Sequence, residues 1–335
     1  MFGLPVGIVR ETPQDLSVVC GEREMGAVSI LVGVDGSAGS EVALRWAMRE
    51  AALRSAASND AEQSVVTALM AWTAQEPFGG VLRALTIADH TTIAQAAEQR
   101  LESSIARVGP PAPAVELRRI VTPGEPVSAL VERAGGADMI VAGTHGHGAL
   151  GRVTIGCVTQ GVLYHASIPV VVTRPAHDDE AGPVRPADED RRPVVVGVDG
   201  SEPSLAALRW AAQAAAVRHV PLRVLHGWGG YDPLYADALA AAQGSMARQA
   251  GRIVDRAVEL GLTPAGAPQV TVEPVVSSES GVRALLDASQ QAQLLVVGSR
   301  GLGGFARLLL GSVSHQCVLH AACDIAVIRA PKRPA

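Results

Sequence analysis

The sequence predicts an α/β protein made of two tandem doubly wound domains, each with a five-stranded parallel sheet flanked by helices. The length of 335 residues is typical of two domains, and 48% apolar residues are enough for two buried cores. The hexapeptide VGVDGS occurs at residues 32–37 and again at residues 196–201. In both halves of the chain, short apolar runs alternate with segments that have a helical pattern.

The repeat extends well beyond the hexapeptide. The pentapeptide ALRWA at residues 43–47 recurs at residues 207–211, and GTHGHG at residues 143–148 corresponds to GSRGLG at residues 298–303. A unit of this length is much longer than a solenoid repeat, which favours the duplication of a whole domain. We therefore expect an N-terminal extension (1–27), a first domain (28–174), an acidic and Pro-rich linker (175–192), a second domain (193–330) and a tail (331–335).

The expected strands are short apolar runs rich in valine, a composition typical of strands that are buried on both faces. In the second domain we expect strands at residues 193–198, 222–226, 270–276, 294–298 and 325–328. The helices expected between them lie at residues 202–218, 234–260, 280–291 and 307–321. In the first domain the strands are expected at residues 29–34, 65–71, 115–121, 139–143 and 170–173. Strands joined by helices form parallel sheets through right-handed crossovers, so a ligand site is expected at the carboxyl edge, where the strand order reverses.

The composition excludes several classes of function. The net charge is −5 and aromatic residues make up 3% of the chain, which argues against nucleic-acid binding and against binding to an anionic membrane surface. Lys332 is the sole lysine, so the chain has no Walker-type phosphate loop and no credible Schiff-base site. No apolar run has the length of a membrane span and the N-terminus has no signal-peptide pattern, so we expect a cytoplasmic protein.

The four cysteines, Cys20, Cys157, Cys317 and Cys323, form no CxxC pair and have no zinc-like spacing with histidine. We expect free thiols, since disulfides are rare in the cytoplasm. His145 and His147 form an HxH motif without an evident third ligand, so no metal site is predicted.

The segment from Gly298 to Ser314 is the most informative in the chain. It leaves the fourth strand of the second domain, contains several glycines and leads into a helix. Glycines let the backbone approach a ligand closely, and the N–H groups of such a loop, with the positive end of the next helix, can bind a phosphate. Ser312 and Ser314 would add hydroxyl donors, and Arg300 is a candidate phosphate contact. The alternative is a tight turn in which glycine only permits close packing.

Asp199 lies at the end of the first strand of the second domain, at the same carboxyl edge. Its carboxylate could accept a hydrogen bond from a ribose or an adenine, or it could simply be the N-cap of the next helix. Asp35 has the corresponding position in the first domain. The presence of an aspartate and a glycine loop at both switch points favours a nucleotide site.

A known family shares this combination of motifs. The spacing G-x2-G-x9-G-[ST] fits Gly298, Gly301, Gly311 and Ser312, with VGVDGS upstream. The chain therefore resembles the universal stress protein family, and within it the ATP-binding subgroup in its tandem two-domain form. The resemblance covers both domains and implies the strand order 3-2-1-4-5 in each of these nucleotide-binding domains. It also implies a role in stress survival or growth control. We expect ATP to be a regulatory ligand of a cytosolic protein, with or without Mg²⁺, because two such sites occur without a suitable lysine or an evident general base.

The resemblance assigns ATP binding to the strand-one aspartate, the residue after strand two, the glycine loop and the start of the following helix. In the second domain the candidates are Gly197, Asp199, Gly227, Gly298, Ser299, Arg300, Gly301, Leu302, Gly303, Gly304, Gly311, Ser312, Val313 and Ser314. In the first domain they are Gly33, Asp35, Ala71, Gly143, Thr144, His145, Gly146, His147, Gly148, Gly156, Cys157, Val158 and Thr159. Cys157 stands where the second domain has Ser312, and a thiol is the weaker hydrogen-bond partner, so weaker binding is expected in the first domain.

Two other functions stay open at this point: a slow ATPase or other nucleotide-transforming enzyme, and a nucleotide-free structural interaction module. An enzyme would need a carboxylate to orient water, and only Asp35 and Asp199 are available, so no catalytic residue is assigned. The last strands of the two domains are short and apolar, and unpaired edges of this kind invite pairing. We expect them to pair with each other within the chain, while a homodimer remains open.

Overall fold

The computed structural model describes residues 27–57, 63–73, 90–144, 155–174, 190–229, 236–262, 268–302 and 310–330. The chain divides into two compact units, Met1–Gly148 and Ala149–Ala335. The boundary lies before the end of the first sequence repeat, so the last helix and strand of that repeat belong to the second unit.

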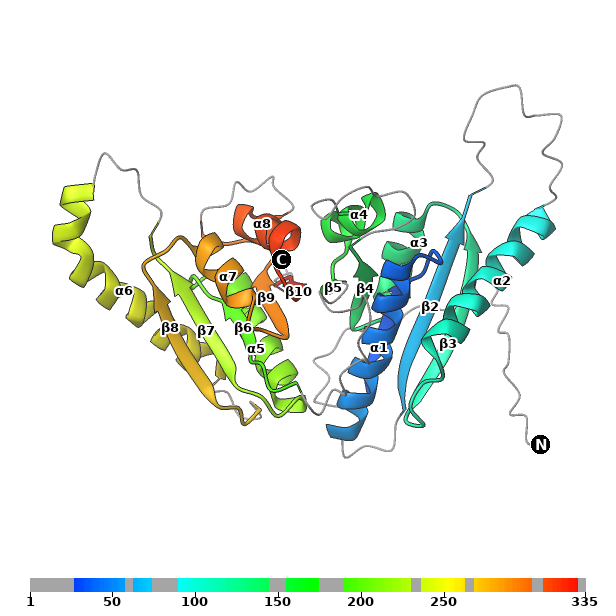
Figure 1. Ribbon diagram of the computed structural model, residues 1–335, viewed down its shortest axis with the longest axis horizontal. Coiled ribbons are helices and arrows are strands. Elements are labelled where there is room, and N and C mark those ends of the chain that lie inside the picture. The colour runs from blue at the N-terminus through cyan, green and yellow to red at the C-terminus, as the bar shows by residue number, and fades with distance from the viewer. Residues whose placement is uncertain are drawn as a thin grey trace, which may run out of the picture. The chain divides into compact units, whose positions relative to one another are not determined.

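The first unit is a parallel sheet with helices on both faces (Figure 1). Its strands are β1 (Ser29–Gly33), β2 (Ser64–Trp72), β3 (Val115–Pro123) and β4 (Met139–Gly143), in the order β3-β2-β1-β4. Helices α1 (Ala38–Ala57) and α2 (His90–Val108) pack on one face, and α3 (Pro126–Arg133), followed by the 3-10 turn η1 (Ala134–Gly136), packs on the other. Ile30 and Val32 of β1 and Ile140 and Val141 of β4 are fully buried, because these central strands are covered on both faces.

The second unit contains the last two elements of the first repeat and the whole second repeat. The former are α4 (Cys157–His165) and β5 (Val170–Thr173). The strands of the second repeat are β6 (Val194–Gly197), β7 (Leu222–Gly227), β8 (Val272–Ser277), β9 (Leu294–Gly298) and β10 (Asp324–Ile328). Its helices are α5 (Glu202–Val217), α6 (Ala236–Leu262), α7 (Gly281–Ser289) and α8 (Ser312–His320).

The strand order in this unit is β5-β10-β9-β6-β7-β8. The five strands of the second repeat are parallel and follow the predicted order 3-2-1-4-5, while β5 pairs with β10 antiparallel. Val170 lies opposite Val327 and Val172 opposite Ile325. The pairing of the two last strands is therefore as predicted from their apolar sequences.

The order reverses between β6 and β9, so their connections run to opposite sides of the sheet. Helices α5 and α6 pack on one face of the sheet, and α7 and α8 pack on the other. All five residues of β9 are buried, and Val194, Val195 and Val196 of β6 have no exposed surface. The carboxyl ends of these two rigid strands lie side by side and form the base of the candidate site.

The strands agree with their predicted positions to within two residues at each end, but the last helix begins later than predicted. A helix was expected from residue 307, whereas α8 begins at Ser312. Gly311 is its N-cap, with an extended backbone (φ −72°, ψ 158°), so the helix cannot continue through this residue. Residues 303–309 lie outside the described residues.

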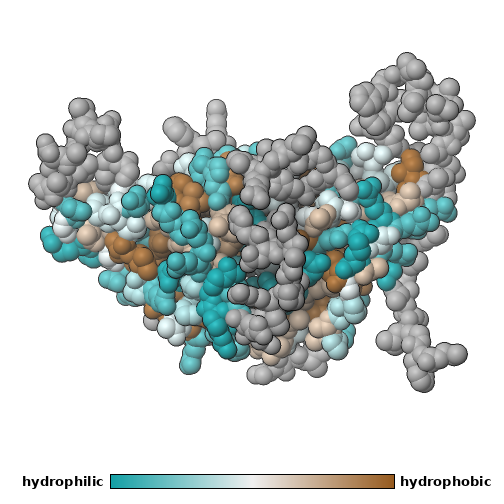
Figure 2. All heavy atoms as spheres, in the orientation of Figure 1, coloured by the Kyte–Doolittle hydropathy of each residue, from teal (hydrophilic) through white to brown (hydrophobic). Residues whose placement is uncertain are grey.

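Within the described residues, none of the helices combines the length and the apolar character needed to cross a bilayer. On the face shown in Figure 2, hydrophilic and apolar residues are interspersed over the described surface.

Candidate functional site

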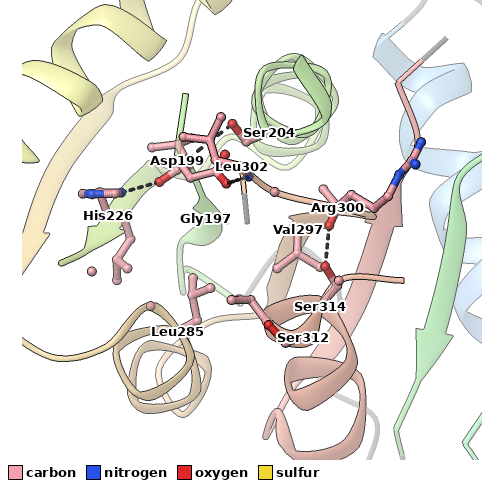
Figure 3. A pocket seen from close by; sticks show the side chains of 18 residues that line it. Gly197, Asp199, Ser204, His226, Leu285, Val297, Arg300, Leu302, Ser312 and Ser314 are labelled. Atoms are coloured by element: carbon pink, nitrogen blue, oxygen red, sulfur yellow. Dashed lines mark hydrogen bonds between the residues drawn. The ribbon is translucent and has the colours of Figure 1, made fainter. Parts of the chain in front are cut away.

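A pocket of about 470 Å³ opens at the carboxyl ends of β6 and β9 (Figure 3). This volume is within the range of roughly 300–1,000 Å³ that is usual for small-molecule sites. The sequence candidates that line it are Gly197, Asp199, Gly227, Gly298, Arg300, Gly301, Leu302, Gly311, Ser312, Val313 and Ser314. Figure 3 shows Asp199 and Leu302 on one side of the pocket, with Leu285 and Ser312 on the other.

Asp199 joins the end of β6 to the glycine loop that follows β9. Its Oδ1 atom accepts hydrogen bonds from the backbone N–H (3.0 Å) and the hydroxyl (2.6 Å) of Ser201. Its Oδ2 atom accepts the backbone N–H of Leu302 at 3.0 Å. The N-cap of α5 is Ser201, whose hydroxyl accepts from the N–H of Ser204. The capping role considered for Asp199 is therefore wrong: Asp199 instead holds the turn in front of the cap.

The Asp199 carboxyl is set up to stay ionised. Burial is the largest single influence and raises its pKa, but the hydrogen bonds that the carboxylate accepts, chiefly from Ser201 and Leu302, together hold the pKa below its ordinary value of 3.8. The hydroxyl of Ser204 donates to the carbonyl of Ser201 instead, at 2.8 Å. A carboxylate offers about four acceptor positions, so one remains available beside the three bonds to Ser201 and Leu302.

The glycines of the loop are required by the packing of the chain itself. A Cβ atom at Gly298 would lie 2.8 Å from the carbonyl carbon and oxygen of Pro203, in the first turn of α5. A Cβ atom at Gly301 would collide with Oδ2 of Asp199. At both positions the close-packing interpretation accounts for glycine without a ligand, and the loop is thereby held against Asp199.

The N-terminus of α8 forms the opposite side of the pocket. Its N-cap, Gly311, has no side chain to satisfy the first N–H groups of the helix, and Ser312 and Val313 are exposed. The N–H of Gly311 donates to the carbonyl of Ser299 at 2.8 Å, which ties the cap to the end of β9. Ser299 itself is buried behind the pocket. This helix end offers N–H groups and a positive partial charge to an anion.

Two of the polar candidates do not present a free polar group to the pocket. The hydroxyl of Ser314 is buried and donates to the carbonyl of Gly298 at 2.6 Å, so its proton is already engaged. In Figure 3 the guanidinium of Arg300 points away from the space between Asp199 and Ser312. Ser312 is thus the hydroxyl candidate that remains exposed at the helix end.

The apolar wall of the pocket was missed by the sequence analysis. It consists of Val198, Leu225, Leu285 and Val297, and His226 lies at its edge. Nδ1 of His226 is 2.7 Å from the carbonyl oxygen of Val198, which can only accept, so Nδ1 is the donor of this bond and holds the ring in place. Leu285 could have been found from its place on the apolar face of a helix, but nothing in the local sequence shows that this face meets the end of β6.

Comparisons with known proteins agree with the two sequence repeats. The profile of the universal stress protein family matches residues 28–174 and again residues 190–329. This chain belongs to the universal stress protein family. A universal stress protein of Mycolicibacterium smegmatis is 33% identical over 303 residues, which cover 90% of this chain and 96% of that protein. One from Mycobacterium tuberculosis is 33% identical over 305 residues, covering 90% and 97%.

The fold of the family is also found among solved structures. A universal stress protein from Archaeoglobus fulgidus superposes with a TM-score of 0.57 at 16% identity, covering 92% of this chain and 98% of that one. At this identity the likeness concerns the fold alone.

The first-repeat candidates of this universal stress protein fall in both units. Gly33, Asp35, Ala71, Gly143 and Thr144 belong to the first unit, and Gly156, Cys157, Val158 and Thr159 belong to the second. His145, Gly146, His147 and Gly148 lie outside the described residues, as do Gly303 and Gly304 of the second repeat.

The first unit repeats the local geometry around Asp199. Oδ1 of Asp35 accepts the N–H (2.9 Å) and the hydroxyl (2.5 Å) of Ser37. A Cβ atom at Gly143 would lie 2.5 Å from the carbonyl oxygen of Gly39, in the first turn of α1, as the one at Gly298 would meet Pro203. The two aspartates therefore have the same local role in their turns.

The described cysteines differ in exposure. Cys157 is exposed at the first position of α4, whereas Cys317 and Cys323 are buried, and all three are free thiols. Burial raises the pKa of Cys317 and of Cys323 to about 12. The residues that the structure describes contain no group of three His, Cys, Asp or Glu side chains able to hold a metal ion.

Proposed function

We propose that this universal stress protein binds ATP in the pocket between β6 and β9, and that ATP acts there as a regulatory ligand in the stress response. The observation that carries the proposal is the pairing of two features across one pocket of about 470 Å³. Asp199, an ionised carboxylate, lies on one side, and the N-terminus of α8, without a side-chain cap, lies on the other. These features suit a ligand with hydroxyl donors at one end and phosphates at the other.

The phosphates would bind at the N–H groups of Ser312 and Val313 and at the Ser312 hydroxyl. A helix N-terminus binds anions without lysine, which fits a chain whose sole lysine is Lys332. The ribose or the adenine would donate to the remaining acceptor position of Asp199. The base would lie against the apolar wall with Leu285, next to His226. A Mg²⁺ ion would be bound mainly through the phosphates, because Asp199 is the sole carboxylate among the described residues of the lining.

We infer a regulatory role for ATP from the chemistry available in the pocket. Hydrolysis needs a group that orients water near the γ-phosphate. Asp199 lies across the pocket from the start of α8, and its oxygens already accept bonds from Ser201 and Leu302. We propose a second ATP site in the first repeat, weaker because Cys157 replaces Ser312, and a cytoplasmic location, where ATP is supplied.

The direct test is to identify and titrate the ligand. We expect protein purified without added nucleotide to release ATP on denaturation, detected by mass spectrometry, and calorimetry to show ATP binding. Ser312→Asp should weaken binding at the second-repeat site at least tenfold, because an acid at an exposed helix N-terminus favours the helix but repels phosphates. Ser245→Asp, on α6, is the matched control for the added charge.

Three outcomes would overturn the proposal. ADP in the released ligand together with steady phosphate production would support a slow ATPase. A protein that contains no nucleotide and gives no binding heat with ATP would support a structural interaction module. Equal ATP affinity of Ser312→Asp and wild type would remove the helix end from the site.

A further inference from the structure

Two arginines at matching places in the repeats cap the last helix of the opposite repeat. Arg174 follows β5 of the first repeat, and its Nη2 donates to the carbonyl oxygen of Val318 in α8 of the second repeat. Arg329 follows β10 of the second repeat, and its Nη2 donates to the carbonyls of Leu163 (2.6 Å) and Tyr164 (3.1 Å) in α4. All these residues belong to the second unit, where β5 and β10 are paired.

The contacts satisfy groups that a helix cannot satisfy by itself. The last four carbonyls of an α-helix have no partner within the helix, and a cation near them also interacts favourably with the helix dipole. At the end of α8, the N–H of Ala321 donates to Cys317, and Arg174 supplies the donor for Val318. Arg174 is partly buried, and its Nε atom is buried without a hydrogen-bond partner.

The N-terminus of the same short helix forms the side of the pocket that lies opposite Asp199. Helix α8 has nine residues, so its two ends are only about 13 Å apart. Its first turn is fixed by the bond of Ser314 to Gly298 and by that of the Gly311 N–H to Ser299. Its last turn is held by the bond from Arg174 to Val318 and by the buried side chains of Cys317 and Val318. Because the helix is this short, loss of the bond at Val318 would also displace the N–H groups of Ser312 and Val313.

We propose that Arg174, a residue of the first repeat, is a positioning residue for the ATP site of the second repeat. The inference rests on the proposed function, since it concerns the same pocket. The second repeat therefore does not make its full site alone, because the arginine that caps α8 and places it comes from the first repeat. Arg329 has the reciprocal relation to α4, the helix that begins at Cys157.

The test compares Arg174→Ala with Arg329→Ala in a background in which only the second-repeat site can bind. Cys157→Asp provides this background, because Cys157 is exposed at the start of α4 and an acid there repels phosphates. We expect Arg174→Ala to weaken ATP binding three- to tenfold by calorimetry and Arg329→Ala to stay within twofold. Both variants lose an arginine bound to a helix C-terminus, so a general loss of stability would affect both alike.

A readout without ligand tests the same relation. Hydrogen exchange of the α8 amides should become faster in Arg174→Ala than in Arg329→Ala, and the α4 amides should show the reverse order. Arg174→Lys, which keeps a charged donor, should recover part of the ATP affinity, and it serves as the test variant where Arg174→Ala does not fold.

The outcomes separate this inference from the proposed function. If the Cys157→Asp protein does not bind ATP, the proposed function fails at this site. If it binds ATP and Arg174→Ala leaves the affinity unchanged, or if both arginine variants weaken it equally, the positioning role of Arg174 is refuted and the proposed function stands.

Discussion

The carboxylate of Asp199 accepts the backbone N–H of Leu302 at 3.0 Å, across a gap of 103 residues in the sequence. This bond joins the turn after β6 to the glycine loop after β9. The same carboxylate binds Ser201, which is the N-cap of α5. One ionised side chain thus connects two adjacent loops at the mouth of the pocket.

Replacing Asp199 by Asn should lower both ATP affinity and stability. The carbonyl oxygen of Asn can still accept from Ser201. Its NH2 group would then face the N–H of Leu302, and two donors cannot form a hydrogen bond with each other. We expect the free energy of unfolding to fall by about 1.5–3 kcal/mol and ATP affinity to fall several-fold to a hundredfold. Chemical denaturation and calorimetry measure the two effects.

Asp35→Asn is the matched control, because Asp35 makes the same bonds to Ser37 in the first unit. Measured on the Cys157→Asp background, it should leave ATP binding to the second repeat unchanged. Wild-type ATP affinity in Asp199→Asn would contradict the proposed contact to the ligand.

The lowered pKa of Asp199 predicts a specific dependence of stability on pH. A carboxyl whose pKa is lower in the folded than in the unfolded protein stabilises the fold above its unfolded pKa, and this contribution disappears as the pH falls through the folded pKa. The difference in unfolding free energy between wild type and Asp199→Asn should be constant above about pH 5 and shrink as the pH falls below about 3.8. Urea denaturation across this range measures it, and a difference that grows toward acid pH would refute the assignment.

Gly298→Ala should destabilise the protein even without a ligand. The new methyl group would lie 2.8 Å from the backbone of Pro203, so β9 and α5 would have to separate, at a cost of about 1–3 kcal/mol. Gly251→Ala in α6 is the control, because a Cβ atom there meets nothing within 4 Å and alanine favours the helix by about 0.5–1 kcal/mol. Thermal unfolding should therefore shift in opposite directions in the two variants.

Substitutions of Ser312 and Ser314 should have different effects, one on ATP binding and the other on the stability of the fold. Ser314→Ala removes the buried bond to the Gly298 carbonyl and should cost about 1–3 kcal/mol of stability. Ser312→Ala removes an exposed hydroxyl, so it should leave the melting temperature nearly unchanged and weaken ATP binding by up to about tenfold.

Cys157→Ser, the reciprocal change, should strengthen ATP binding at the first-repeat site when the second-repeat site is blocked by Ser312→Asp. If Ser312→Ala and Cys157→Ser both bind like their parents, the ranking of the two sites is wrong.

Much of the fold is determined by the sequence alone, because its signals are local. The valine runs of β6 and β9 identify strands buried on both faces, and alternation with helices makes the sheet parallel. The repeat of VGVDGS shows that the chain contains one domain twice and places an aspartate at the carboxyl edge in each copy.

The tertiary structure alone decided which atoms these residues contact. Residue 298 must be glycine because a side chain there would collide with the backbone of Pro203. The hydroxyl of Ser314 donates to the carbonyl of Gly298, and Leu285 lines the pocket from α7. Arg174 and Val318 are 144 residues apart and meet only because β5 pairs with β10. Sequence patterns report which face of an element is buried, through periods of two or 3.6 residues. The partner on that face depends on how distant segments pack, and no local period records it.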